Sequence, residues 1–140
     1  MDNLPTGYEL REGADARAAQ TFLVDSYWNK GITGDEIALA LAHSFAISVW
    51  HAGQQVGMAR VVSDRVTIAY LNDVYVLKEH RGKGLATAMI EYVRSRPEFE
   101  GVGRWLLFTK DAQPLYRALG WQEYLWPSRT MIVDHTVFPK

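Results

Sequence analysis

The sequence contains no cysteine, and that absence excludes several kinds of scaffold and site. A disulfide framework, a cysteine nucleophile and a thiolate metal centre all need thiols that the chain does not have. Its histidines are also scattered, without the spacing typical of metal ligands: they are His43, His51, His80 and His135. We therefore expect a protein that has no bound metal.

Long apolar runs are missing as well. No stretch approaches the roughly 18 consecutive apolar residues of a membrane-spanning helix. The first ten residues contain Pro5 and Gly7 and lack the basic start and apolar run of a secretory signal peptide. We therefore expect a cytoplasmic protein with no membrane partner.

Charge of one sign is not in excess, because 15 Lys and Arg face 16 Asp and Glu, for a formal net charge of −1. Proteins that hold nucleic acids through their overall charge are strongly basic, so we expect no nucleic-acid partner. The composition is that of a globular protein, with 48% hydrophobic and 22% charged residues. A length of 140 residues predicts a single domain over residues 1–140.

The apolar periodicity predicts strands and helices in the order β-α-α-β-β-β-α-β-α-β-β. This order favours an α+β, or α/β layered, domain with a mixed sheet. The expected strands are Tyr8–Arg11, Phe45–His51, Gln55–Ser63, Arg65–Leu77, Arg104–Thr109, Trp121–Leu125 and Thr130–His135. The expected helices are Asp15–Trp28, Thr33–Ser44, Gly84–Arg96 and Ala112–Leu119.

Local signals add detail to this pattern. Asp15 and Asp111 are expected helix N-caps, and Thr33 with Glu36 has the spacing of a capping box. The fourth expected strand is long, and a β-bulge near Asn72-Asp73 would fit its length.

The most informative segment joins a predicted strand to a predicted helix through Arg81-Gly82-Lys83-Gly84. A helix N-terminus presents backbone N–H groups and its positive dipole end to an anion, and glycine lets the backbone approach closely. Arg81 and Lys83 add positive charge. The loop is therefore a candidate pyrophosphate site; the other interpretation is a glycine-rich turn that starts the helix without a ligand.

Two motifs in this chain resemble those of the GNAT superfamily of acetyltransferases. Arg81-Gly82-Lys83-Gly84-Leu85-Ala86 is similar to its acetyl-CoA motif, Q/R-x-x-G-x-G/A. The segment 105–121 is similar to its second core motif, a strand and a helix ending in L-Y-x-x-x-G-F/W. The element order also matches. The resemblance implies the GNAT fold, a mixed, mostly antiparallel sheet of about six or seven strands with helices on both faces and splayed central strands.

The resemblance implies direct transfer of the acetyl group of acetyl-CoA, as co-substrate, to a primary amine of a small molecule or peptide. It implies no metal, and it allows a homodimer, since dimers are common among relatives. Thr109 stands where the family often has Asn. The residues that the resemblance assigns to the cofactor are Val74, Tyr75, Val76, Arg81, Gly82, Lys83, Gly84, Leu85, Ala86, Thr87 and Thr109.

Two residues receive a catalytic role from the resemblance. Tyr116 matches the general-acid tyrosine, and a phenol of pKa about 10 can protonate a departing thiolate. Its other interpretation is a helix tyrosine that packs beside its neighbours. Some relatives carry a base Glu where this chain has Asn72, so the adjacent Asp73 is the candidate base, acting directly or through water. Asp73 could equally orient a cationic substrate or be a structural carboxylate at a bulge.

In this family the acceptor site is built largely from the N-terminal helices and the C-terminal strands. The candidate substrate-binding residues are Tyr27, Trp28, Tyr70, Asn72, Trp126 and Arg129. Aromatic rings can contact an ammonium group face-on. Tyr70 also falls on the base position of histone-type relatives, where an ordinary phenol is a poor base. In the alternative, purely structural interpretation, Tyr27 and Trp28 pack under the second helix and Arg129 is a solvated surface residue.

A second functional interpretation stays open, that of a catalytically silent acyl-CoA-binding or sensor domain. Tyr116 and the complete glycine loop favour the enzyme, whereas the missing Glu at Asn72 favours the silent domain.

Overall fold

The structure is a computed structural model that describes residues 4–135. The chain forms two compact units, Met1–Phe108 and Thr109–Lys140. The first unit holds the whole sheet and its covering helices, and the second holds one α-helix and a 3-10 turn. The single domain expected over residues 1–140 stays a prediction.

The sheet of the first unit has the strand order β1-β2-β3-β4-β5. Its strands are β1 (Tyr8–Glu12), β2 (Phe45–His51), β3 (Gln54–Ser63), β4 (Ala69–Val76) and β5 (Trp105–Leu106). The first four pair antiparallel in sequence order, and β5 runs parallel to β4. The mixed, mostly antiparallel sheet is therefore confirmed, with five strands among the described residues instead of the expected six or seven.

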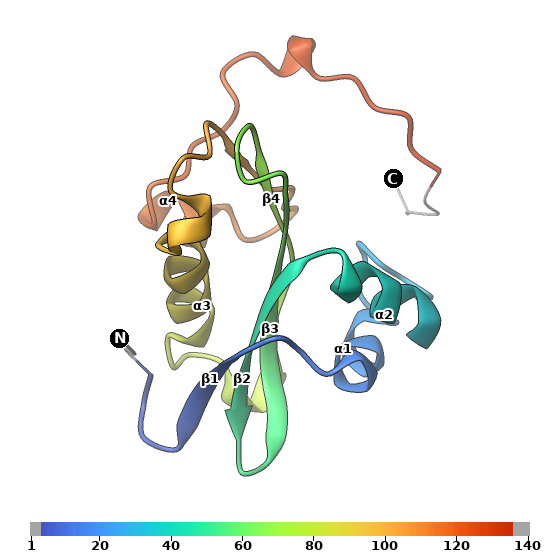
Figure 1. The fold of residues 1–140 in the computed structure, drawn as a ribbon, viewed down its shortest axis with the longest axis vertical. Coiled ribbons are helices and arrows are strands. Elements are labelled where there is room, and N and C mark those ends of the chain that lie inside the picture. The colour runs from blue at the N-terminus through green and yellow to red at the C-terminus, as the bar shows by residue number, and fades with distance from the viewer. Residues whose placement is uncertain (1–3, 136–140) are drawn as a thin grey trace. The chain divides into compact units, whose positions relative to one another are not determined.

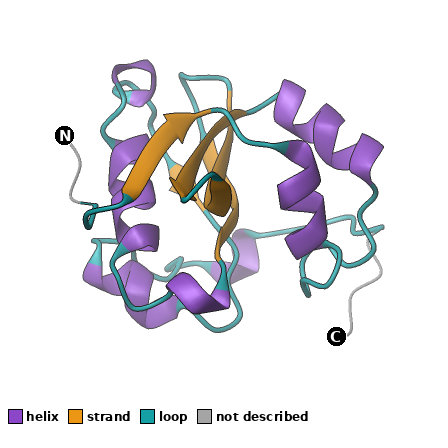
Figure 2. Cartoon of the chain, turned by 90° about the horizontal axis from the view of Figure 1, so that it is seen from below, coloured by secondary structure: helices purple, strands orange, loops and turns teal. Residues whose placement is uncertain are grey.

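Helices cover both faces of this sheet (Figure 1). α1 (Ala16–Leu23) and α2 (Gly34–Ala42) pack together on one side, and α3 (Leu85–Arg94) contacts β2, β3 and β4 from the other. Figure 2 shows the strands of the first unit between these helical layers. The expected α+β layered architecture is confirmed.

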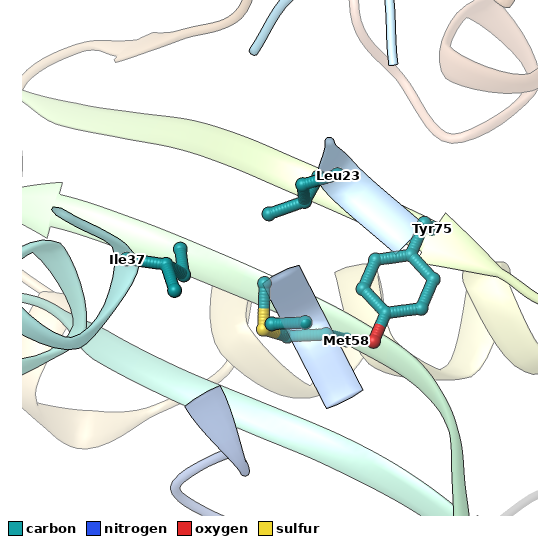
Figure 3. Close-up of a cluster of buried hydrophobic side chains, with 5 residues drawn as sticks. Leu23, Ile37, Met58 and Tyr75 are labelled. Atoms are coloured by element: carbon teal, nitrogen blue, oxygen red, sulfur yellow. The ribbon is translucent and has the colours of Figure 1, made fainter. Parts of the chain in front are cut away.

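The core under α1 and α2 is built from side chains of both helices and two strands (Figure 3). Ala19 and Leu23 of α1, Ile37 of α2, Met58 of β3 and Tyr75 of β4 form one buried cluster. Burying each such apolar side chain stabilises the fold by roughly 1.5–3 kcal/mol. The cluster fixes both helices against β3 and β4, the strands that carry the candidate site.

On the opposite face, Gly57 of β3 allows close packing against α3. A Cβ at this position would lie 3.0 Å from the carbonyl oxygen of Tyr75 and 3.3 Å from Cε of Met89. A larger residue there would need the β4 backbone at Tyr75 and the end of the Met89 side chain to shift by a few tenths of an ångström.

Several local predictions are confirmed. The Asp15 carboxylate accepts a hydrogen bond from the backbone N–H of Ala18, as an N-cap does. Thr33 and Glu36 make both hydrogen bonds of a capping box at the start of α2. The bulge is found at Asp73.

Three boundaries differ from expectation, and in two of them a side chain forms hydrogen bonds with backbone groups. The first helix ends at Leu23 instead of Trp28, since the Ser26 hydroxyl donates to the Leu23 carbonyl and accepts from Asn29 N–H. β4 begins at Ala69 instead of Arg65, since the Asp64 carboxylate accepts the N–H groups of residues 66–68 and shapes a loop. The strand expected over 104–109 is limited to β5.

The second unit holds α4 (Gln113–Ala118) and the 3-10 turn Pro127–Arg129. Asp111 is not its cap, because Ala112 occupies the N-cap position and the Thr109 hydroxyl accepts the Ala112 N–H. The two strands expected over 121–125 and 130–135 are wrong, because that stretch forms no strand and 122–135 is exposed. Residues with a high strand propensity form a strand only where a neighbouring strand pairs with them, and Pro127 interrupts the segment 121–135.

Candidate active site

The bulge in β4 is the central feature of the site. Arg60 pairs with Asn72 and Met58 pairs with Tyr75, so that Asp73 and Val74 together face the single intervening residue of β3. Asp73 has φ +52°, a left-handed conformation that Asp tolerates better than most residues. The extra residue shifts the alternation of β4, so that Asn72 and Tyr75 both lie on the face covered by α1 and α2.

Beyond the bulge, one edge of β4 is open. β5 pairs with β4 at two positions, Ala69 with Trp105 and Tyr70 with Leu106. β4 continues to Val76, and among residues 4–135 no strand lies beside that edge from Leu71 onward. Backbone N–H and C=O groups on an open strand edge can pair with an extended ligand.

The Asp73 carboxylate is buried at this bulge, and its side chain has 0% exposure. Its Oδ2 accepts a hydrogen bond from Arg60 Nε at 2.8 Å. Its Oδ1 accepts from Trp28 Nε1 at 2.8 Å and from Asn29 Nδ2 at 2.6 Å. Both oxygens therefore have donors, and the carboxylate ties β3 and the segment after α1 to the bulge.

Arg60 is itself buried, with 8% of the residue exposed. Its Nη1 donates to Ser44 Oγ at 3.0 Å, and that hydroxyl donates to the carbonyl of Ala40 at 2.5 Å. The network therefore extends from the bulge to the C-terminal end of α2.

Two tyrosines beside the bulge stay protonated at neutral pH. Burial, and next the negative charge of Asp73, raise the pKa of Tyr70, while Arg60 acts in the opposite direction. Burial also raises the pKa of Tyr75, whose hydroxyl accepts from Gln55 Nε2 at 3.0 Å. A raised pKa lowers the fraction of Tyr70 that is deprotonated at neutral pH, so less phenolate is available to act as a base.

The glycine loop, residues 81–84, follows β4 after a short 3-10 turn, Lys78–His80. Gly82 and Gly84 have φ +76° and +77°, and Gly84 is the N-cap of α3 without any side-chain cap. The first N–H groups of a helix have no acceptor within it, so they are available to a ligand. A Cβ added at either glycine would meet nothing within 4 Å, so there is open space beside the loop. These features fit a pyrophosphate group.

Arg81 is oriented by the strand that precedes the loop. Its Nε donates to the carbonyl of Val76 at 2.9 Å, while the residue is exposed. The guanidinium therefore lies at the end of β4. Lys83 is also exposed, so positive charge gathers on the loop.

Of the candidate substrate residues in the first unit, Trp28 is half-buried, as are Tyr27, Tyr70 and Asn72. Trp28 packs against the core cluster that contains Ile37 of α2, and it donates to Asp73. Tyr27 contacts its ring edge-on, with centroids 5.0 Å apart. Asn72 accepts the N–H of Asp73 through Oδ1 at 2.8 Å. Trp28 thus contacts this core and also reaches the bulge, and its role toward a substrate stays a prediction.

The second unit carries the remaining candidates. Tyr116 is a buried residue of α4, and its ring meets Trp121 edge-on at 5.7 Å between centroids. The Thr109 hydroxyl accepts a hydrogen bond from the backbone N–H of Ala112 at the start of α4. The Arg129 guanidinium lies 4.5 Å from the centroid of the half-exposed Trp126 ring.

Sequence reasoning missed Arg60, Asn29 and Ser44. One signal was available for Arg60, since it interrupts a run of apolar strand residues, and a buried cation there demands a partner. It also missed the contact of the Tyr8 hydroxyl with His80 Nδ1 at 2.7 Å, which joins β1 to the turn before the glycine loop.

Residues 4–135 contain no group of three His, Cys, Asp or Glu placed to hold a metal ion. Within the same range, every helix is too short or too polar to cross a membrane.

Comparisons with known proteins agree with this fold. Residues 43–123 match the family model of the acetyltransferase (GNAT) domain. A curated protein of Gibberella zeae is 34% identical over 82 residues, which are 57% of this chain and 45% of that protein. The match thus spans less than half of that relative's length.

Two solved structures extend the comparison. A GNAT-family protein from Xanthomonas campestris pv. campestris has 33% identity and a TM-score of 0.86, covering 94% of this chain and 95% of that one. The Xanthomonas protein and the Gibberella relative are both named as putative acetyltransferases. A protein from Deinococcus radiodurans R1 shares the fold, with a TM-score of 0.74 and 18% identity over 96% of this chain and 94% of that one. The chain therefore belongs to the GNAT family of acetyltransferases.

Proposed function

We propose that this protein transfers the acetyl group of acetyl-CoA directly to a primary amine of a small molecule or peptide. The observation that carries the proposal is the continuity of one segment. The bulged β4 with its open edge leads within a few residues into the exposed glycine loop and the free N-terminus of α3.

This segment has the chemistry that an acyl-CoA needs. The backbone of Val74, Tyr75 and Val76 would pair with the amide groups of the pantetheine arm. The pyrophosphate would accept hydrogen bonds from the N–H groups of the loop and of the first turn of α3. Arg81 and Lys83 would add positive charge. The proposed pyrophosphate ligands are the backbone groups of Gly82, Lys83, Gly84, Leu85, Ala86 and Thr87.

The transfer needs no covalent intermediate on the protein, in agreement with a chain without cysteine. The amine nitrogen attacks the thioester carbon, the carbon–sulfur bond breaks, and the acetyl group stays on nitrogen. A backbone N–H of residues 74–76 would polarise the carbonyl, and one such donor is worth roughly 10²–10³ in rate.

Two protons must move in this reaction. The departing thiolate gains one, and Tyr116 is the proposed donor because its position matches the L-Y-x-x-x-G-F/W motif. The amine loses the other, and Asp73 acting as the base stays a prediction. The paired oxygens of Asp73 favour the alternative of a structural carboxylate at the bulge.

One observation supports the second function, an acyl-CoA-binding domain without catalysis. Asn72 replaces a base Glu, and the neighbouring Asp73 already has a donor on each oxygen. The two functions differ in turnover and not in CoA affinity.

The test is a screen for release of CoA thiol from acetyl-CoA across amino acids, polyamines, aminoglycosides and peptides. Turnover that requires both substrates supports the transferase. Tight binding of acetyl-CoA in calorimetry, with no thiol released by any amine, supports the silent domain instead. A homodimer stays a prediction, which sedimentation would test.

A further inference from the structure

The proposed transfer leaves the Arg60 guanidinium without a role. It lies on β3 between Ala59 and Val61, both buried, and its own side chain is 10% exposed. Placing a cation in such surroundings costs free energy unless it is paired and hydrogen-bonded. Its partners, the Asp73 carboxylate and the Ser44 hydroxyl, therefore explain how the fold tolerates it.

The pairing also restricts what Asp73 can do. A general base needs an oxygen within hydrogen-bond reach of the proton that it removes. Here one oxygen faces Arg60 Nε, the other accepts two N–H groups, and the side chain is fully buried. This arrangement holds donors in place and leaves no exposed oxygen for an amine.

Two of the three donors to Asp73, Trp28 and Asn29, belong to the segment between α1 and α2. That segment, residues 24–33, contains no helix or strand. Within it, Ser26 bonds locally, whereas Trp28 and Asn29 reach across to the β4 bulge. The Asp73 carboxylate therefore sets where this segment lies relative to β4.

We propose that Arg60 and Asp73 are positioning residues that fix Trp28 and Asn29 against the β4 bulge as one wall of the acceptor site. The role of the wall rests on the proposed function, because only a transferase has an acceptor. Arg60 orients the carboxylate, the carboxylate orients the indole, and neither charged group exchanges a proton with the substrate.

Three variants separate positioning from proton transfer. Arg60→Gln removes the cation and keeps a polar side chain, and Arg60→Lys is the conservative replacement. Trp28→Phe keeps an aromatic ring and removes the indole donor, with the Arg60–Asp73 pair left in place. Arg17→Gln, at an exposed position of α1, is the control. The measurements are KM for each substrate, the pH profile of kcat/KM, and the indole N–H resonance that disappears in Trp28→Phe.

Positioning predicts that Arg60→Gln moves the Trp28 indole resonance and raises the KM of the acceptor by about 10-fold to about 100-fold. The KM of acetyl-CoA stays within about twofold, the limbs of the pH profile stay in place, and Arg60→Lys restores part of the loss. Trp28→Phe raises the acceptor KM in the same direction. If Arg60→Gln fails to fold, Trp28→Phe carries the kinetic test alone.

Proton transfer predicts a different result. If Asp73 were the base, loss of its cation partner would move the acidic limb of the pH profile. That shift overturns the proposal, as does an unmoved indole resonance or an equal rise in both KM values. If the wild type acetylates no amine, the proposed function fails; the indole resonance of Arg60→Gln then still decides whether the pair positions Trp28.

Discussion

Arg60 and Asp73 join neighbouring strands through a buried ion pair, with Arg60 Nε 2.8 Å from Asp73 Oδ2. The pair lies where β4 bulges, between the α1–α2 connection and the end of α2. It therefore links four parts of the fold that are separate in the sequence: the α1–α2 connection, the end of α2, β3 and β4.

Breaking this pair should destabilise the protein strongly. We expect Arg60→Met to lower the free energy of unfolding by about 3–5 kcal/mol, because it leaves a buried carboxylate without its cation. Arg117→Met is the control, since the Arg117–Glu123 pair is 55% and 74% exposed and should contribute less than about 1 kcal/mol. Urea unfolding measures both, and equal effects of the two variants would contradict the buried role.

The loop before β4 should make stability depend on acidic pH. Hydrogen bonds from the Thr67 hydroxyl and from the N–H groups of Val66, Thr67 and Ile68 hold the pKa of Asp64 well below its ordinary value. A depressed folded-state pKa stabilises the fold above the unfolded-state pKa, near 4, and this contribution is lost as the pH falls through the folded-state value.

The corresponding variants are Asp64→Asn and Thr67→Val. We expect both to lower the melting temperature at pH 7 and to lessen its fall between pH 4 and strongly acidic conditions, Asp64→Asn more than Thr67→Val. Thermal unfolding across that range checks this. A fall as steep in Asp64→Asn as in the wild type would show that other groups cause the acid sensitivity.

Tyr116→Phe tests the proposed acid. Loss of the phenol should lower kcat by about 10²–10⁴ and leave the affinity for acetyl-CoA nearly unchanged. The ring and its contact with Trp121 remain in this variant, so the fold should tolerate it. Steady-state kinetics and calorimetry measure the two quantities, and full activity would exclude the acid role.

Gly84→Val tests the glycine loop. Gly84 has φ +77°, so a branched side chain strains the N-cap of α3 and fills the space assigned to the pyrophosphate. We expect acetyl-CoA binding to fall by at least about 100-fold, roughly the loss of two charge-assisted hydrogen bonds. Gly101→Ala, at an exposed glycine without a left-handed φ, is the control. Unaltered binding in Gly84→Val would place the pyrophosphate elsewhere.

Local sequence signals predicted much of this fold because their causes are local. The capping box of Thr33 and Glu36 and the N-cap of Asp15 involve atoms three residues apart. The bulge followed from the excess length of one apolar run, although its left-handed residue, Asp73, could be located only to within a residue.

The errors arose where a side chain bonds to the backbone, or where a segment becomes a strand only if another strand pairs with it. Ser26 ends a helix that the apolar pattern predicted to continue. Asp64 forms a loop from residues that the same pattern predicted to be a strand. The run around Met131 is rich in strand-forming residues, but in the described part of the second unit no strand pairs with it.

The candidate site was predicted only in part for a similar reason. The residues from Arg81 to Ala86 are consecutive in the sequence, so the motif that predicts the loop already contains the residues that form it. The partners of Asp73 lie 13, 44 and 45 residues away in the sequence, at Arg60, Asn29 and Trp28. The fold alone brings these together, and only the isolated charge of Arg60 within an apolar strand indicated that such a partner existed.

The most direct test of the central claim follows an isotopically labelled acetyl group from acetyl-CoA into the acceptor found by the thiol screen. The account predicts labelled N-acetyl product and free CoA thiol in equal amounts, with both greatly reduced in Tyr116→Phe. Thiol release without acetylated amine, or tight CoA binding with neither product, would contradict it.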